Sequence, residues 1–369
     1  MNITFIKQDN NPHLLLIMAG WGMDANPFHD LSHPGYDIAV TWDYTHESLD
    51  KAVLSPYREI VVIAWSMGVM ECARIIPGSG LPVTLTIAVN GTMTPVDNNT
   101  GIPESIFNGT LETLSVETLT RFNRRMCGSA ERYKEFTDIS PRRSVESLRQ
   151  ELEILGKRAT ENARPSDMRW DMAVIGSRDM IFPAANQQKA WNEIETLTVD
   201  CPHLPDFQSI IKKFVIDKKR VADRFDNTRD TYDNAARLQH NVANRLAVNL
   251  LKKTGRRKHF SDAIEIGAGS GRLTRLYTPS LDIGRLQLWD LAPMDPDLVP
   301  QGATMIADDA EARLFEVPDN STNLVISAST LQWFNSPINA IIQIKRILKP
   351  GGIAAISLYT QGTYASLAE

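Results

Sequence analysis

The sequence lacks the marks of three classes of protein. Its N-terminus, MNITFIKQDNN, has no basic segment followed by an apolar one, so no signal peptide is expected. No apolar run approaches about 18 residues, so no segment is predicted to span a membrane. The net charge of −5 argues against a protein that binds nucleic acid over its whole surface. Cysteine is scarce: three residues, far apart and odd in number, predict no disulfide framework and a reducing, cytoplasmic location.

The chain does contain enough apolar residues for large cores. Its 369 residues, 43% of them hydrophobic, are about twice the usual length of a domain. Short apolar segments alternate with helical patterns in two successive series. The first comprises residues 3–6, 13–20, 36–42, 59–65, 81–91, 168–177 and 195–200, and the second 262–269, 285–292, 303–310, 322–329 and 352–359. Most are continuous rather than alternating, which is typical of parallel strands covered by helices on both faces.

The two series predict two α/β domains, residues 1–214 and 215–369. Residues from about 110 to 162 interrupt the first series; they are polar, helical in pattern and rich in arginine, as expected of an inserted helical cap. The joint near residues 212–222, KKFVIDKKRVA, is charged instead of rich in glycine and serine. This composition favours a stiff, helical connection.

The segment IVVIAWSMGVM, residues 60–70, places one hydroxyl between an apolar strand and a helix. A sharp strand-to-helix turn needs small neighbours, and Ala64 and Gly68 flank Ser66 in a variant of the G-x-S-x-G pattern. Such a turn would lift the hydroxyl above the sheet and direct the main-chain N–H of Met67 at an oxyanion. The alternative is a turn that contains serine by chance.

An acid and a histidine follow this serine in the chain order that α/β-hydrolases use. Asp179 follows a predicted strand in AVIGSRDMIFP, and His203 lies in the loop DCPHLPDF after the last strand of the first series. Of the seven histidines, four precede the serine and do not fit this order. The order predicts that Ser66 attacks, His203 transfers the proton and Asp179 orients the imidazole. The alternative for His203 is an ordinary histidine of a surface loop.

A second oxyanion donor is expected after an early strand, in IMAGWGMD. Gly20 and Gly22 would let the main chain approach a substrate, with the N–H of Trp21 as the donor. The alternative is a glycine turn that only reverses the chain. Together, these residues predict hydrolysis of an acyl ester without a cofactor.

In the second domain, AIEIGAGSGRLTRLY places glycines between a strand and a helix with the spacing E-x-G-x-G-x-G. A dinucleotide-binding loop reads G-x-G-x-x-G, so here the third glycine comes one residue early. The spacing is similar to that of methyltransferases that use S-adenosylmethionine (SAM). We predict that Glu265, Gly267, Gly269 and Gly271 bind SAM, with Glu265 facing its cationic end. A domain that binds NAD is the alternative.

Two further strand ends complete the predicted SAM site. Asp290 ends the strand in LQLWDLAP and would accept hydrogen bonds from both ribose hydroxyls. In IADDAEARLF, Asp309 rather than Asp308 would accept a hydrogen bond from the adenine amino group, with the N–H of Ala310 donating to the ring. No metal site is predicted in either domain.

Both halves resemble known families. Residues 1 to about 210 resemble the BioG type of esterase from biotin synthesis, which hydrolyses pimeloyl-carrier-protein methyl ester, through MAGWGMD, IAWSMGV, VNGTMTPVDNNTGIPESIFNGTLETLS, FNRRMCG and PHLPDF. Residues from about 218 resemble the BioC type of malonyl-carrier-protein O-methyltransferase, through VADRFDNTRDTYDNAARLQHNVANRL, IEIGAGSG, DLAP, ADDAE and LQWF. The resemblance implies a fusion in which one half adds a methyl ester with SAM and the other removes it.

This pairing has a chemical reason. Methylation of the malonyl carboxylate removes a charge that would be costly to bury in the apolar pockets of fatty-acid synthesis, and hydrolysis at the pimeloyl stage restores it. Both implied substrates ride on acyl carrier protein (ACP), which is acidic. Arginines of the cap are therefore expected to contact it: Arg121, Arg124, Arg125, Arg142, Arg143 and Arg149. The alternative is a solvated helix face balanced by its own glutamates.

Two points remain open from the sequence: how complete the second domain is, and which substrates the two domains use. The sequence stops at SLYTQGTYASLAE, just after the fifth strand of the second series, so we expect an incomplete methyltransferase sheet with an unpaired edge. The alternative function is a general short-chain carboxylesterase joined to a SAM-fold module that is non-catalytic or acts on another substrate.

Overall fold

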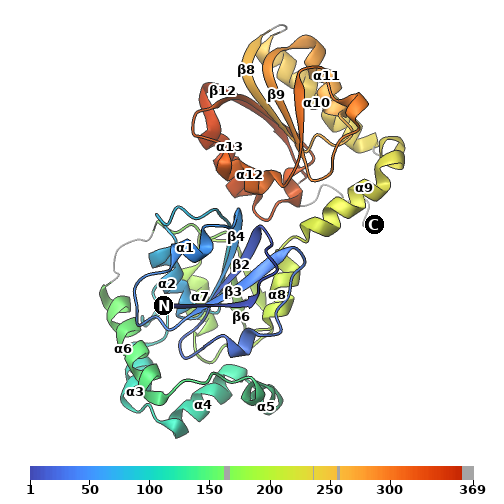
Figure 1. Ribbon diagram of the computed structural model, residues 1–369. Coiled ribbons are helices and arrows are strands. Elements are labelled where there is room, and N and C mark those ends of the chain that lie inside the picture. The colour runs from blue at the N-terminus through green and yellow to red at the C-terminus, as the bar shows by residue number, and fades with distance from the viewer. Residues whose placement is uncertain (162–166, 236, 256–257, 360–369) are drawn as a thin grey trace. The chain divides into compact units, whose positions relative to one another are not determined.

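A sheet of seven strands in the order β1-β3-β2-β4-β5-β6-β7 forms the centre of the first half (Figure 1). All neighbouring strands run parallel except β1, which is antiparallel to β3. The strands are β1 (Asn2–Lys7), β2 (His13–Met18), β3 (Tyr36–Trp42), β4 (Glu59–Trp65), β5 (Val83–Val89), β6 (Met172–Gly176) and β7 (Thr196–Val199). The computed structural model describes residues 1–161, 167–235, 237–255 and 258–359, and the chain forms two units, Met1–Val215 and Ile216–Glu369.

Helices cover both faces of this sheet and extend beyond one end of it. α1 (Lys51–Leu54), α2 (Gly68–Ile75), α7 (Ala184–Ala190), α8 (Phe207–Phe214) and the short 3-10 helix η1 (Asn26–Phe28) connect or follow the strands. Between β5 and β6 the chain inserts α3 (Glu104–Glu112), α4 (Val116–Cys127), α5 (Ala130–Asp138) and α6 (Val145–Glu161), which gather at one end of the sheet (Figure 1). α4 begins with a capping box at Ser115 and ends at Gly128, whose φ of 75° stops the helix.

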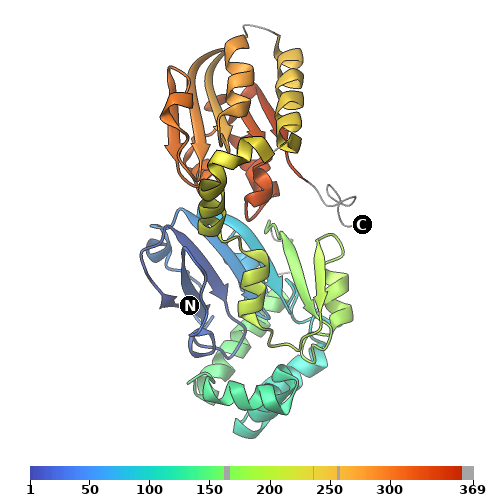
Figure 2. The same cartoon turned by 90° about the vertical axis from the view of Figure 1, so that its right-hand side faces the viewer.

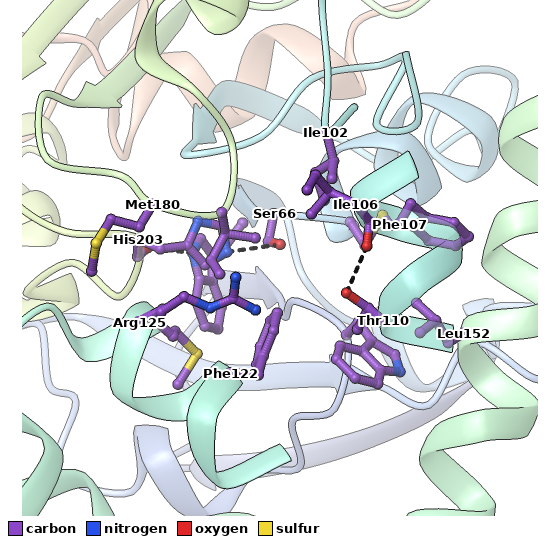
Figure 3. A pocket seen from close by; sticks show the side chains of 15 residues that line it. Ser66, Ile102, Ile106, Phe107, Thr110, Phe122, Arg125, Leu152, Met180 and His203 are labelled. Carbon is purple, nitrogen blue, oxygen red and sulfur yellow. Dashed lines mark hydrogen bonds between the residues drawn. The ribbon is translucent and has the colours of Figure 1, made fainter. Parts of the chain in front are cut away.

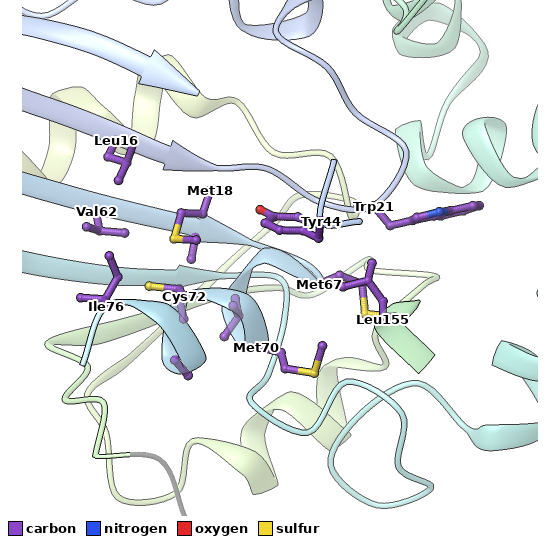
Figure 4. Packing of buried hydrophobic residues seen from close by; sticks show 14 of the residues in the cluster. Leu16, Met18, Trp21, Tyr44, Val62, Met67, Met70, Cys72, Ile76 and Leu155 are labelled. Carbon is purple, nitrogen blue, oxygen red and sulfur yellow. The ribbon is translucent and has the colours of Figure 1, made fainter. Parts of the chain in front are cut away.

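The core of the first unit follows from the alternation of side chains along buried strands. In β2, Leu14 and Leu16 point to one face, where Leu16 packs near Cys72 of α2 (Figure 4). Leu15 and Ile17 point to the opposite face, which α8 covers. All four β2 residues are fully buried. A continuous apolar strand therefore serves two cores at once, which fixes the register of the parallel sheet.

The second unit is a parallel sheet between two helical layers (Figure 2). Its strand order is β10-β9-β8-β11-β12, from β8 (His259–Ile266), β9 (Asp282–Asp290), β10 (Ala303–Ala307), β11 (Thr322–Ala328) and β12 (Leu348–Ser357). α10 (Arg237–Thr254) and α11 (Arg272–Tyr277) pack on one face, and α12 (Ala310–Glu316) and α13 (Pro337–Ile347) on the other. α9 (Lys218–Ala235) precedes α10, and the 3-10 helices are η2 (Thr278–Ser280), η3 (Pro296–Leu298) and η4 (Leu331–Trp333).

All twelve predicted strands are present, and the order of each sheet is that of the expected fold class. Many boundaries differ by a few residues, most of all at two strands. β6 starts at Met172, four residues later than predicted. β12 starts at Leu348, four residues earlier, because KPGG forms an irregularity within the strand in place of a turn before it. Gly351 takes a φ of 78° there. The fifth strand of the second sheet is β12, as expected. Residues 360–369, which follow it, lie outside the described residues. None of the helices in the described part of the chain combines the length and apolar character that crossing a bilayer requires.

Candidate active site

Ser66 sits in a strained turn between β4 and α2. Its φ is 58°, in the left-handed region that non-glycine residues rarely adopt, and its main-chain N–H donates to the carbonyl of Val89 on the neighbouring strand. The turn needs a close approach of two segments: a Cβ at Gly68 would collide with the carbonyl oxygens of Met18 and Ala19. The sequence pattern therefore produces the expected elbow, and Ala64 is tolerated because its side chain is fully buried within β4.

The structure brings the three predicted side chains together in one chain of contacts. The Oγ of Ser66 lies 3.0 Å from Nε2 of His203 (Figure 3), and Nδ1 of His203 lies 2.9 Å from Oδ2 of Asp179. All three residues are buried, and the ring of Phe182 stacks on the imidazole with the centroids 5.8 Å apart. A hydroxyl, an imidazole and a carboxylate in this order can transfer a proton away from the nucleophile.

Several groups hold the carboxylate of Asp179 in place. Its Oδ1 accepts hydrogen bonds from the main-chain N–H groups of Ile181 and Phe182, and its Oδ2 also accepts one from Nε2 of Gln187. Gln187 is fully buried and its Nε2 donates to the carbonyl of Phe182 as well. The acid thus keeps one orientation toward His203 without relying on solvent.

Asn90 is a positioning residue that the sequence analysis missed. Its Nδ2 donates to the carbonyls of Pro202 and His203, and its Oδ1 accepts from the N–H of Gly176, 2.6 Å away. One side chain therefore joins the loop of the histidine to the end of β6, next to the loop of the acid. Asn90 itself has a φ of 45°. The Asn-Gly pair directly after β5 is the signal that was available, because this pair favours left-handed turns.

The two predicted oxyanion donors face the same cavity as the serine. Trp21 and Met67 both line the pocket around Ser66. Within the described residues, neither main-chain N–H is hydrogen-bonded, whereas the indole N–H of Trp21 donates to the carbonyl of Leu148. Met67 directly precedes the first residue of α2, where main-chain N–H groups have no partner inside the helix. These two donors are available to an oxyanion formed beside Ser66.

The pocket above Ser66 is apolar apart from its catalytic side and one cation. We call it the ester pocket; apolar side chains from β4, α3, α4, α6 and the loop after β6 line it, among them Ile106, Phe122 and Leu152 (Figure 3). Its lining also includes one cation, Arg125, which comes from α4 of the inserted helices. Such a pocket suits an uncharged alkyl ester.

The predicted arginines of the cap divide into two groups. Arg121, Arg124, Arg125 and Arg142 are exposed. The prediction for Arg143 is wrong: its side chain is 5% exposed and forms ion pairs with Glu151 and Asp43, so no partner protein can reach it. The local charge pattern does not show that Glu151 and Asp43 pair with this guanidinium. Arg149 is also engaged, because its guanidinium donates to the carbonyls of Leu111 and Leu114.

In the second unit, the predicted glycine loop joins β8 to α11 at the carboxyl end of the sheet. Gly267, Gly269 and Gly271 all have positive φ, and a Cβ at Gly267 would collide with Thr330, whereas the space beside Gly269 is open. Asp290 ends β9 and its Oδ2 accepts a hydrogen bond from the N–H of Gly269. The loop and this acid thus lie together where ligands bind in open α/β sheets, beside the switch between β8 and β11.

Glu265 and Asp309 differ from their predicted roles. Glu265 is 1% exposed, and its carboxylate accepts hydrogen bonds from Thr274 and Tyr277, so it anchors α11 and does not face the ligand side. Asp309 is buried; its Oδ1 caps α12 and its Oδ2 lies 2.6 Å from Nζ of Lys218. The partners of Glu265 lie on the next helix, and the partner of Asp309, Lys218, lies far away in the sequence. A local sequence motif reveals neither set of partners. Ala310 begins α12, as expected from its place after the third strand.

The stability of the second unit is expected to depend on pH through Glu265. Burial raises the pKa of Glu265 to about 7, against the opposing effect of the hydrogen bonds from Tyr277 and Thr274. The folded state then holds the proton more tightly than the unfolded state. This contribution to the free energy of unfolding is fully present below the unfolded pKa and is lost as pH rises through about 7, by about 3 kcal/mol.

Glu265→Gln should remove this contribution. Between pH 5 and pH 8 the wild-type unit should lose stability relative to the variant, measured by hydrogen exchange of amides in β8 and β9. Glu316→Gln, at a more exposed acid of α12, is the control and should leave the difference between the two pH values as in the wild type. A pH dependence that survives in the Glu265 variant would show that this carboxyl is not its source.

Comparison with known proteins gives a match to each half. Residues 1–209 match the family described as Pimeloyl-ACP methyl esterase BioG, and residues 237–368 match a family described as Methyltransferase domain. A malonyl-[acyl-carrier protein] O-methyltransferase of Bacteroides fragilis (strain 638R) is 36% identical over 357 residues, which cover 94% of this chain and 71% of that protein.

A solved BioG structure and a bifunctional biotin-synthesis protein are also similar to parts of this chain. The crystal structure of BioG from Haemophilus influenzae is 35% identical, with a TM-score of 0.52, and the match covers 55% of this chain and 94% of that one. The biotin biosynthesis bifunctional protein BioHC of Cellvibrio japonicus (strain Ueda107) is 32% identical over 157 residues, which cover 41% of this chain and 30% of that protein.

Proposed function

The chain belongs to the BioG family of pimeloyl-ACP methyl esterases and carries a methyltransferase domain behind it, and on this premise we propose that Ser66, His203 and Asp179 hydrolyse pimeloyl-ACP methyl ester. The membership confirms the predicted fold class, an α/β-hydrolase followed by a Rossmann-like methyltransferase domain, and the place in biotin synthesis. The observation that carries the catalytic assignment is the unbroken contact from Ser66 through His203 to Asp179 at the floor of an apolar pocket.

The geometry supports a reaction in two stages. The Oγ of Ser66 attacks the ester carbonyl while Nε2 of His203 takes the hydroxyl proton, and Asp179 stabilises the imidazolium. The main-chain N–H groups of Trp21 and Met67 would bind the oxyanion of the tetrahedral intermediate. His203 returns the proton to the departing methoxide, which leaves as methanol. A water molecule, activated in turn by His203, then hydrolyses the acyl-serine and releases the carboxylate.

The second unit supplies a site that fits SAM in part. The open space beside Gly269 and the carboxylate of Asp290 at the end of β9 suit a nucleoside with its ribose, while the buried Glu265 and Asp309 would act through the helices they anchor. SAM carries an already activated methyl group, so the protein's contribution is to orient an acceptor carboxylate in line with it. The acceptor in this proposal is malonyl-ACP, after the name of the relative that the chain matches along most of its length.

The partner of both units in this proposal is ACP. The exposed arginines of the inserted helices, Arg121, Arg124 and Arg142, would meet its acidic surface, and the ester pocket would receive the end of the acyl chain. Exposed charges of this kind raise the rate of association more than they raise affinity, so their effect should weaken with salt.

The proposal is tested by release of methanol from two methyl esters of the same acid. With the full chain, we expect kcat/KM for pimeloyl-ACP methyl ester to exceed that for monomethyl pimelate by about 100-fold or more, because the carrier and its arm add binding energy remote from the reacting ester. A general short-chain carboxylesterase predicts equal values for both esters. Equal values, or a preference for the free ester, would overturn the assignment.

A further inference from the structure

A second cavity opens directly outside the ester pocket. It lies between α3 and α4, and we call it the outer cavity. Four residues line both cavities: Ile106, Thr110, Phe122 and Arg125. The two spaces therefore adjoin each other, and a ligand whose ester reaches Ser66 would extend past Arg125 toward the outer cavity.

The outer cavity carries positive charge. Arg121 and Arg124 line it without lining the ester pocket, whereas Arg125 lines both. No hydrogen bond or ion pair engages the guanidinium of Arg121 or Arg125 within the described residues, and that of Arg124 lies 5.2 Å from the ring centre of Tyr133. An opposing charge, Glu117, interacts with Arg121 through space, and its carboxylate also accepts a hydrogen bond from the hydroxyl of Ser115.

The same cavity presents hydroxyl oxygens as acceptors. Thr110 and Thr113 each donate their hydroxyl proton to a main-chain carbonyl, which leaves the oxygen able to accept a hydrogen bond. The hydroxyl oxygen of Thr118 already accepts a hydrogen bond from the main-chain N–H of Ser115, and its proton goes to the carbonyl of Thr113. Along α4, Thr118 and Arg125 are separated by about 10 Å, at 1.5 Å per residue. The lining thus offers hydroxyl oxygens that can accept hydrogen bonds from amide N–H groups of a ligand. It also offers guanidinium groups that can donate hydrogen bonds to an anion.

We propose that the outer cavity binds the phosphorylated pantetheine arm of the acyl thioester, with the phosphate held by Arg121 and Arg124 and a carbonyl oxygen of the arm or thioester bound by Arg125. This inference rests on the proposed function, which brings a thioester substrate to Ser66. 4′-Phosphopantetheine carries two amides and ends in a phosphate ester, so its polar groups match the hydroxyl acceptors and the guanidinium groups of Arg121 and Arg124. A planar guanidinium pair is the arrangement that proteins use to bind phosphate.

The arm can come from a carrier protein or from coenzyme A, and both present the same phosphate next to pantetheine. The test therefore uses three soluble substrates that share the methyl pimeloyl group: its thioesters with pantetheine, with 4′-phosphopantetheine and with coenzyme A. Release of methanol by the full chain gives KM for each. We expect the phosphopantetheine thioester to have a KM about tenfold lower than the pantetheine thioester, and the preference to shrink as salt is raised.

Single substitutions then separate the two kinds of arginine. Arg121→Gln and Arg124→Gln should each reduce the tenfold preference to about two- or threefold. Arg125→Gln should raise KM for both thioesters in parallel and leave their ratio near ten. Because the readout is a ratio within one variant, a general loss of activity or stability cancels. Lys134→Gln, at an exposed cation of α5 outside the cavity, is the control and should change neither KM nor the ratio.

Distinct results would overturn the inference and the function on which it rests. Equal KM values for the pantetheine and phosphopantetheine thioesters in the wild type would show that no phosphate site exists. A preference for the coenzyme A thioester alone would assign recognition to the nucleotide and not to the phosphate beside pantetheine. An unchanged ratio in Arg121→Gln combined with Arg124→Gln would remove these residues from the site. Failure to release methanol from all three thioesters would instead contradict the proposed esterase function.

Discussion

Replacing Ser66 by alanine is expected to reduce hydrolysis of pimeloyl-ACP methyl ester by about 10⁴-fold or more. The Oγ of Ser66 is the one atom that can form the covalent intermediate, and His203 has no other hydroxyl in contact with its Nε2 in the described structure. Alanine lacks only the hydroxyl oxygen of serine, so it fits the same small space. The assay is methanol release under saturating substrate, with single-turnover measurements to detect the residual rate.

The controls for this variant come from the same chain. Ser55→Ala, at an exposed serine at the end of α1, should retain full esterase activity. Calorimetric titration with SAM should give the same affinity for Ser66→Ala as for the wild type, because the substitution lies in the other unit. Turnover that is unchanged in Ser66→Ala would end the assignment of this residue as the nucleophile.

The second large effect is expected at Asn90, which positions the histidine and the acid without touching substrate. Asn90→Gly keeps the φ of 45° accessible and removes the side chain with its amide, so backbone strain does not confuse the result. The carbonyls of Pro202 and His203 and the N–H of Gly176 then lose their partner. Misplacement of His203 by a fraction of an ångström should lower kcat by about 100-fold, with KM changed by less than about threefold.

The split between kcat and KM distinguishes positioning from plain stability. A purely structural role for Asn90 predicts a lower melting temperature with kcat unchanged at a temperature where the variant is folded. Asn90→Asp provides the matched comparison: it keeps the acceptor for Gly176 but loses the donors to the loop of His203. We expect its kcat to lie between those of Asn90→Gly and the wild type.

Much of the first site could be predicted because its signals are local or follow the chain order. The strand, the small residues and the serine of 60–70 define the elbow, and a strained φ at Ser66 follows from that turn. Asp179 and His203 were identified by their places after successive strands, and the carboxyl ends of parallel strands meet at one edge of a sheet. The same logic located Asp290 beside the glycine loop.

Other roles could not be predicted because they depend on partners that are distant in the sequence. Arg143 has the same local signal as Arg125, yet one is neutralised by Glu151 in the interior and the other lines the ester pocket. Glu265 was expected to face a ligand, but the side of β8 on which it lies is covered by α11. No periodicity within a segment tells which charged side chain will meet a buried counter-charge.

The amino-acid sequence by itself determined the two α/β units, the elbow of Ser66 and the order in which nucleophile, acid and histidine occur, because strand and turn preferences act between near neighbours. Only the tertiary structure decided that Asn90 ties the loops of the site together, that the side chain of Arg143 is buried and that Arg125 lines two adjoining cavities. These features arise where segments separated by tens of residues pack against each other. Burial and hydrogen-bond satisfaction there are properties of the assembled fold and not of any one segment.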